Sequence, residues 1–90
     1  MTRRHDMTFP ELAAELRERG YRTISTTGCM VSAFAGRHWV SVTLAPSKYG
    51  RYDVRYHDAH GSTRMDFAAT MDEAWEIIES KAERPGGVNE

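Results

Sequence analysis

Hydrophobic residues follow a helical period at both ends of the chain and alternate with polar residues in the middle. Near the N-terminus, Thr8 and Glu11 have the spacing of a capping box, in which hydroxyl and carboxylate each accept a hydrogen bond from a free backbone N–H. Gly20 can adopt the left-handed conformation that ends many helices. Between these signals lies an apolar stripe made of Phe9, Leu12, Ala13 and Leu16. The pattern predicts a helix over residues 9–19.

The chain after this helix is rich in threonine, valine, isoleucine and aromatic residues, which favour strands. Gly28, Gly36 and Pro46 divide it into three segments. These three extended segments cover residues 22–27, 29–35 and 37–45. The first segment has a single large aliphatic residue, Ile24, so it is either a strand or an extended lead-in.

Alternation within the third segment predicts which side chains face the core. One set should point inward, namely Val40, Val42 and Leu44. The other set should point outward and consists of Trp39, Ser41 and Thr43. An exposed tryptophan is therefore expected on the outer face of the sheet.

The stretch from 51 to 67 predicts a hairpin of two antiparallel strands. Asp58 and Gly61 suit the first and fourth positions of a type I turn, with positive φ at the glycine. In the first strand the inward set is Tyr52, Val54 and Tyr56. In the second, the alternation separates Thr63, Met65 and Phe67 from Arg64 and Asp66, and we expect the two charged residues to face solvent.

A second helix is predicted over residues 71–83. Thr70 and Glu73 repeat the capping-box spacing, and Asp72 adds negative charge where the helix dipole favours it. The helix should end before Pro85. Its broad apolar face consists of Met71, Ala74, Trp75, Ile77, Ile78 and Ala82.

These elements predict an α+β fold with the order α-β-β-β-β-α. The strands should form a four-stranded antiparallel meander with both helices on one face and the other face open to solvent. We expect a single α+β domain over residues 8–84, between disordered tails at 1–7 and 85–90.

Composition narrows the class of protein. The 90 residues carry 12 Lys+Arg against 13 Asp+Glu, a net charge of −1, which disfavours a dedicated nucleic-acid binder. One cysteine and no long apolar run predict a cytoplasmic protein without a membrane segment or internal disulfide. We expect a monomer or a weak homodimer.

The sequence does not predict a catalytic or metal site. Four histidines, His5, His38, His57 and His60, lack the regular spacing of zinc ligands, although Asp58 lies near two of them. Cys29 is most simply a small buried hydrophobic residue. The expectation is therefore a protein that is not an enzyme, with no metal, no cofactor and no small-molecule substrate.

The open face is the candidate partner-binding site. Its expected members are Trp39, Ser41, Thr43, Arg51, Asp53, Arg55, His57, Arg64 and Asp66. Tryptophan and arginine provide much of the energy at binding hot spots, which selects Trp39, Arg51, Arg55 and Arg64 as partner-binding residues. His57 is expected on the same face and is included with them. The alternative is that Trp39 is covered by a tail or stacks under an arginine and has no binding role.

The helices carry a second candidate surface, an acidic patch of Glu73, Glu76 and Glu79 on the second helix. Such residues commonly form only a solvated helix exterior. The alternative is a negative surface that docks on a basic partner.

Residues 50–78 resemble the arm-type DNA-binding domain of phage integrases, which has an antiparallel sheet followed by a helix. The residues that carry the resemblance are Tyr56, Asp58, Gly61, Thr63, Arg64, Phe67, Thr70, Glu73 and Ala74. The resemblance implies a sheet that enters the major groove, with Arg51, Arg55 and Arg64 contacting DNA. Asp53 and Asp66 interrupt this basic face and would weaken phosphate attraction.

The small size, slight acidity and open-faced sheet also make the chain similar, as a class, to phage-encoded anti-CRISPR proteins. This resemblance implies a stoichiometric inhibitor that binds a bacterial defence complex. We therefore expect a protein-binding module of this kind, with DNA binding as the alternative.

Overall fold

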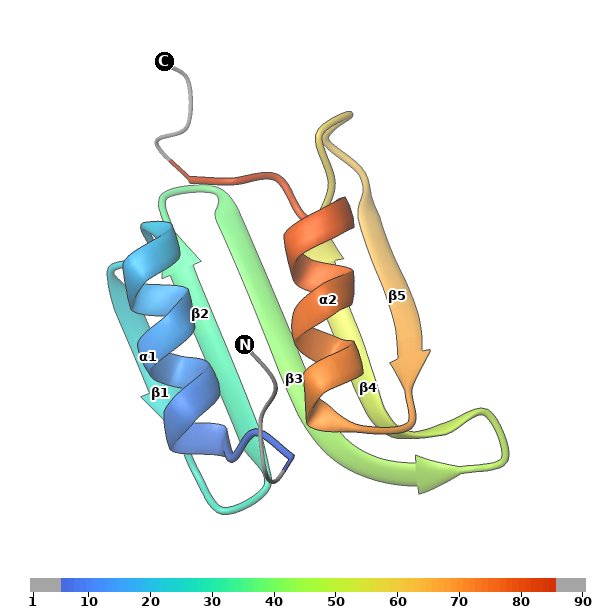
Figure 1. Cartoon of the computed structure of the whole chain (residues 1–90). Helices are drawn as coiled ribbons and strands as arrows, with labels where there is room; N and C mark the ends of the chain where they lie inside the picture. Colours follow the sequence, from blue (N-terminus) through green and yellow to red (C-terminus); the bar gives the residue numbers. More distant parts are fainter. Residues whose placement is uncertain (1–5, 86–90) are drawn as a thin grey trace.

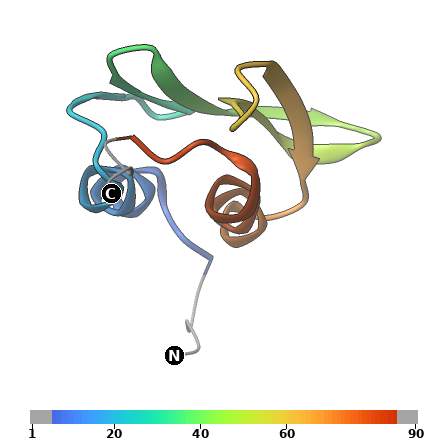
Figure 2. The ribbon, with the colours of Figure 1, turned by 90° about the horizontal axis from the view of Figure 1, so that it is seen from above.

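Two helices cover one face of a five-stranded antiparallel sheet in the computed structural model, which describes residues 6–85 (Figures 1 and 2). The strands pair in sequence order, so the sheet is a meander from β1 to β5. The elements are α1 (Phe9–Arg19), β1 (Thr23–Thr26), β2 (Met30–Ala35), β3 (His38–Ser47), β4 (Gly50–His57), β5 (Thr63–Ala68) and α2 (Met71–Lys81). The α+β class and the placement of both helices on one face agree with the sequence prediction.

The prediction of four strands was one strand short, because residues 23–26 form a true strand, β1. It pairs antiparallel with β2, and Ile24 lies opposite Ala33 on the helix-covered side. The other three residues of β1 are exposed and polar, as suits an edge strand with one neighbour. With one apolar residue to carry the alternation, the sequence signal for this strand was weak.

Helix α1 has the bounds and the caps that the sequence predicted. The Thr8 hydroxyl accepts a hydrogen bond from the Glu11 N–H, and the Glu11 carboxylate accepts one from the Thr8 N–H at 2.9 Å. Gly20 ends the helix with a φ of 117°. A side chain at that position would be strained, so glycine is the residue that this turn requires.

Helix α2 ends at Lys81, two residues before the predicted end at residue 83. After it the backbone becomes extended: Ala82 forms an isolated β-bridge with Asp58, and the Glu83 N–H donates to the His57 carbonyl at 2.8 Å. The capping box is also altered, because the Glu73 carboxylate accepts from the Ala69 N–H rather than from that of Thr70.

Side chains near α1 hold both ends of α2. The Asp6 carboxylate accepts hydrogen bonds from the Met71 and Asp72 N–H groups, each at 2.9 Å. The Arg19 guanidinium donates to the carbonyls of Ile78 and Ala82, each at 3.1 Å. An anion at the N-terminus and a cation at the C-terminus both complement the helix dipole.

The predicted N-terminal tail over residues 1–7 therefore extends too far. Asp6 is bonded to α2, and Met7 is buried with 3% exposure. Residues 1–5 and 86–90 lie outside the described residues, whereas Pro85, assigned to the C-terminal tail, is buried.

The core lies between the helices and the inner face of the sheet, as the alternation predicted. Fully buried side chains come from both layers: Leu12, Leu16, Val31, Val40, Val42, Val54, Met71 and Ile78. α1 packs on β1 and β2, and α2 packs on β4 and β5 (Figure 1). Tyr21, just after α1, is also buried and was not predicted as a core residue.

We predict that Asp6→Ala lowers the free energy of unfolding by about 1 kcal/mol, because two N–H groups at the start of α2 lose their acceptor. Urea denaturation measures this change. Glu76→Ala, an exposed change on the same helix, is the control and should leave stability within about 0.5 kcal/mol of wild type. Equal stability of the two variants would contradict a role for Asp6 in holding α2.

Candidate functional site

The face of the sheet that the helices do not cover is the candidate functional site, and we call it the open face (Figure 2). Its members follow from the strand registers, because residues paired across antiparallel strands point to the same side. On β2 to β5 the register places on the open face Met30, Ser32, Phe34, Trp39, Ser41, Thr43, Arg51, Asp53, Arg55, His57, Thr63, Met65 and Phe67.

One apolar group on this face is a pair of aromatic side chains on β2 and β3. Phe34 lies directly opposite Trp39 in the register. Phe34 is 45% exposed and Trp39 is partly exposed. Trp39 therefore points outward as predicted, but its aromatic neighbour on β2 was not identified from the sequence.

A second apolar group lies at the β5 edge of the open face. Met65 is 46% exposed and Phe67 is 36% exposed. The ring of Tyr49, from the turn between β3 and β4, lies 5.3 Å from the ring of Phe67, centroid to centroid. Tyr49 is itself 65% exposed, so an aromatic pair extends this edge towards solvent.

Polar side chains separate the two apolar groups. Ser41 lies opposite both Ser32 and Arg55 in the register, and Arg55 also lies opposite Met65. Arg55 is exposed and has no ion-pair partner within residues 6–85. Arg51 is exposed as well, with its guanidinium carbon 6.0 Å from the centre of the Tyr52 ring.

The predicted placement of Arg64 and Asp66 on the open face was wrong. Arg64 lies opposite buried Tyr56, and Asp66 lies opposite buried Val54, so both belong to the side that carries α2. The turn sets this register: the Asp58 N–H donates to the Ser62 carbonyl and the Gly61 N–H to the Asp58 carbonyl. A register different by one residue would exchange the two faces of β5.

Arg64 forms an ion pair with Asp58 of the β4–β5 turn and does not point out from the open face. Its Nε donates to the Asp58 carboxylate at 2.9 Å, although 62% of the arginine side chain remains exposed. The same carboxylate accepts from the backbone N–H groups of His60 and Ser62. The hydrogen bond from Arg64, followed by that from Ser62, lowers the pKa of Asp58 to about 2.

Asp66 has partners on the helix side of β5. Its carboxylate accepts from the Tyr56 hydroxyl at 2.7 Å and from the Lys81 ammonium at 3.1 Å. Burial raises the pKa of Asp66, but these hydrogen bonds outweigh burial and the net shift is downward. Burial, supported by the bond to Asp66, raises the pKa of Tyr56 to about 12, so this hydroxyl remains a donor at neutral pH.

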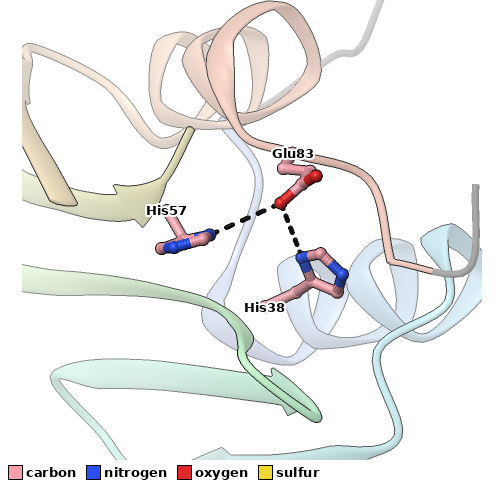
Figure 3. A group of neighbouring side chains, drawn as sticks. All are labelled: His38, His57 and Glu83. Atoms are coloured by element: carbon pink, nitrogen blue, oxygen red, sulfur yellow. Dashed lines mark ion pairs between the residues drawn. The ribbon is translucent and has the colours of Figure 1, made fainter. Parts of the chain in front are cut away.

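His57 lies opposite Thr63 in the register, at an open-face position as predicted, but at the end of β4 its Nδ1 atom is near a carboxylate that follows α2. This atom lies 3.5 Å from Glu83 Oε1, and His38 Nδ1 lies 2.9 Å from the same oxygen (Figure 3). The two imidazole rings are 6.1 Å apart, centroid to centroid. The sequence did not link these three residues, because each comes from a different element.

The acidic patch lies on α2, away from the open face. Glu73, Glu76 and Glu79 are all exposed. The Glu73 carboxylate accepts from the Ala69 N–H and therefore also has a structural role at the start of the helix.

The interpretation of Cys29 as a buried residue was wrong, because it lies exposed in the link between β1 and β2. Its backbone N–H donates to the Thr27 hydroxyl at 3.2 Å. His60 is exposed in the β4–β5 turn, and His5 lies outside the described residues.

Comparisons with protein-family models, with curated proteins and with solved structures each gave no match. Within residues 6–85, neither helix has the length and apolar character needed to cross a membrane.

We predict that Asp58→Asn lowers the melting temperature at pH 7, because Arg64 and two turn N–H groups lose an ionised acceptor. The folded pKa of about 2 lies below the ordinary aspartate pKa of 3.8, so the carboxylate stabilises the fold fully above pH 3.8. This stabilisation is lost as the pH falls through about 2. Thermal melts of variant and wild type should therefore converge in acid.

Arg64→Ala tests the Arg64–Asp58 ion pair from the other side, and Arg55→Ala is its matched control. The Arg64 change should destabilise the fold, and the Arg55 change should not, since Arg55 has no ion-pair partner within residues 6–85. A difference in melting temperature between Asp58→Asn and wild type that stays constant from pH 7 to pH 2 would contradict the stabilising role of the ionised Asp58 carboxylate.

Proposed function

We propose that the chain is a non-enzymatic protein-binding module whose working surface is the open face. The observation that carries the proposal is the exposure of Phe34, Met65 and Phe67 at outward positions of the sheet. A single exposed apolar residue is ordinary. Here such residues gather in two groups, each with a further aromatic side chain, and this composition is typical of protein interfaces.

The arrangement of the open face suggests the chemistry of the partner. Apolar side chains at two places offer anchors for hydrophobic groups, and the serine and threonine hydroxyls between them can pair with backbone groups. Arg55 adds an exposed cation near Met65, which suits a carboxylate on the partner. The partner surface should therefore be largely apolar, with at least one acidic residue.

DNA is the second candidate, supported by the exposed arginines Arg51 and Arg55. Several features weigh against it. Arg64 is bonded to Asp58, and Asp53 lies on the open face opposite Phe67. A net charge of −1 also provides little phosphate attraction, which normally supplies much of the affinity for DNA.

We further propose that the partner belongs to a bacterial defence complex and that binding inhibits it. This step is supported by the resemblance of class to anti-CRISPR proteins, in size, slight acidity and sheet architecture. Adding the purified chain to a CRISPR surveillance complex and measuring target-DNA binding tests it directly. Unchanged DNA binding at saturating amounts of the chain would count against that complex as the target.

We predict that Phe34→Ala and Phe67→Ala each reduce the free energy of partner binding by roughly 2 kcal/mol. Both side chains are substantially exposed, so folding should be nearly unaffected. Partners are captured on immobilised wild-type chain, identified by mass spectrometry, and titrated as purified proteins by calorimetry.

Glu76→Ala on α2 is the matched control for this experiment, because Glu76 is exposed but lies away from the open face. It should bind the partner like wild type. A partner that loses affinity only with Glu76→Ala would show that the acidic patch, not the open face, is the working surface.

For DNA we predict no measurable binding of a random duplex at physiological salt. Fluorescence titrations at low and at physiological salt test this prediction, with Arg55→Ala as the comparison. Tight binding that falls steeply with salt and is weakened in Arg55→Ala would instead favour DNA as the partner.

A further inference from the structure

His38, His57 and Glu83 converge at one end of the sheet, where the chain leaves α2 (Figure 3). His38 begins β3, His57 ends β4, and Glu83 lies in the extended segment after α2. Figure 3 shows the glutamate carboxylate directed towards both imidazole rings. Within the described residues, these three side chains are the group that brings metal-ligand atoms together.

Backbone hydrogen bonds bring these segments together independently of the three side chains. The Glu83 N–H donates to the His57 carbonyl at 2.8 Å, so two of the three residues are tied directly. The bridge between Ala82 and Asp58 fixes the neighbouring positions. The three side chains are therefore brought together by the fold and not by their mutual attraction alone.

The nitrogen atoms that face the carboxylate lack good hydrogen bonds. Nδ1 of His38 and Nδ1 of His57 are both buried from solvent, and neither has a hydrogen-bond partner of acceptable geometry within residues 6–85. The Nδ1 of His38 nevertheless lies 2.9 Å from Glu83 Oε1. Buried polar atoms normally have partners, so two orphaned nitrogens directed at one carboxylate need an explanation.

We propose that His38, His57 and Glu83 bind one divalent cation of the zinc class. One candidate ligand atom from each side chain lies within 4.8 Å of the others. Zinc bonds of about 2.0–2.2 Å place tetrahedral ligands about 3.3–3.5 Å apart, so small side-chain rotations close the site. A bound cation would supply the partner that both Nδ1 atoms lack.

The ligand chemistry selects the class of metal. Two imidazoles and one carboxylate suit zinc and related transition metals, whereas magnesium and calcium prefer oxygen ligands alone. Three protein ligands leave the fourth tetrahedral position to water. The side chains are 14–28% exposed, so a cation and its water can reach the site from solvent.

The cation would join three segments that are distant in sequence. It would connect the start of β3 and the end of β4 to the segment after α2, and so hold α2 on the sheet. Because Phe34, Met65 and Phe67 are not ligands, this role is separate from the proposed binding function. Either proposal can fail without the other.

The alternative is a simple ion pair, in which Glu83 balances a protonated histidine without any metal. Titration of the full chain, free of any histidine tag and stripped with a chelator, distinguishes the two cases. With zinc chloride at pH 7 we expect one-to-one binding by calorimetry and a higher melting temperature. No binding and no change in melting temperature would leave the ion pair as the correct account.

Substitutions of the three proposed ligands test where the cation binds. His38→Ala, His57→Ala and Glu83→Gln should each weaken zinc binding by at least about tenfold, since each removes a ligand. His60→Ala is the matched control, because it removes an exposed histidine of the β4–β5 turn and should bind zinc like wild type. Zinc binding that survives all three ligand changes would overturn the proposal.

A measurement on the wild-type chain covers the case in which a ligand variant does not fold. In NMR spectra, zinc should shift the imidazole signals of His38 and His57 and leave those of His60 unchanged. Excess magnesium should not displace the zinc. Shifts confined to other histidines, or displacement by magnesium, would contradict a site of this composition.

Discussion

The position of α2 is the constraint on which both surfaces of this protein depend. The Asp6 carboxylate caps the first N–H groups of the helix, and the Arg19 guanidinium binds the carbonyls at its end. Both contacts join the region of α1 to α2, so the two helices cover the same face of the sheet (Figure 2). The opposite face is left to solvent, and the segment after α2 is carried to the end of β4.

In β5 the charged side chains face the helix side of the sheet and the apolar side chains face solvent, which is the reverse of the usual arrangement. An edge strand usually turns apolar groups towards the core and charges towards water. In β5 the charged Arg64 and Asp66 face the α2 side, where Asp58, Tyr56 and Lys81 supply partners. The apolar Met65 and Phe67 are exposed as a consequence. Both charged side chains gain ion-pair partners on this side. The cost is the exposure of two apolar side chains, which a bound protein would remove.

The two proposals concern different parts of the molecule and different chemistry. The open face offers apolar and hydroxyl groups over a broad area, which suits a protein surface. The three ligand side chains at the end of β3 and β4 offer nitrogen and oxygen donors at a single point, which suits a cation. A cation there would strengthen the attachment of α2 and leave the exposed apolar side chains of the open face unchanged.

The sequence by itself determined the helix starts, the end of α1, the hairpin turn and the alternation in β3 and β4, because these depend on local spacing and on turn chemistry. It also placed Trp39 and Arg55 on the open face correctly. The existence of β1 required the tertiary structure, because pairing with β2 stabilises a segment that has little hydrophobic signal of its own. The side of β5 to which Arg64 and Asp66 point was likewise decided by pairing, because the turn sets the register of the strand. On that side Asp58 in the turn pairs with Arg64, and Lys81 on α2 pairs with Asp66. The meeting of His38, His57 and Glu83 had no local signal at all, because only the folding of three distant segments onto one end of the sheet brings their ligand atoms together.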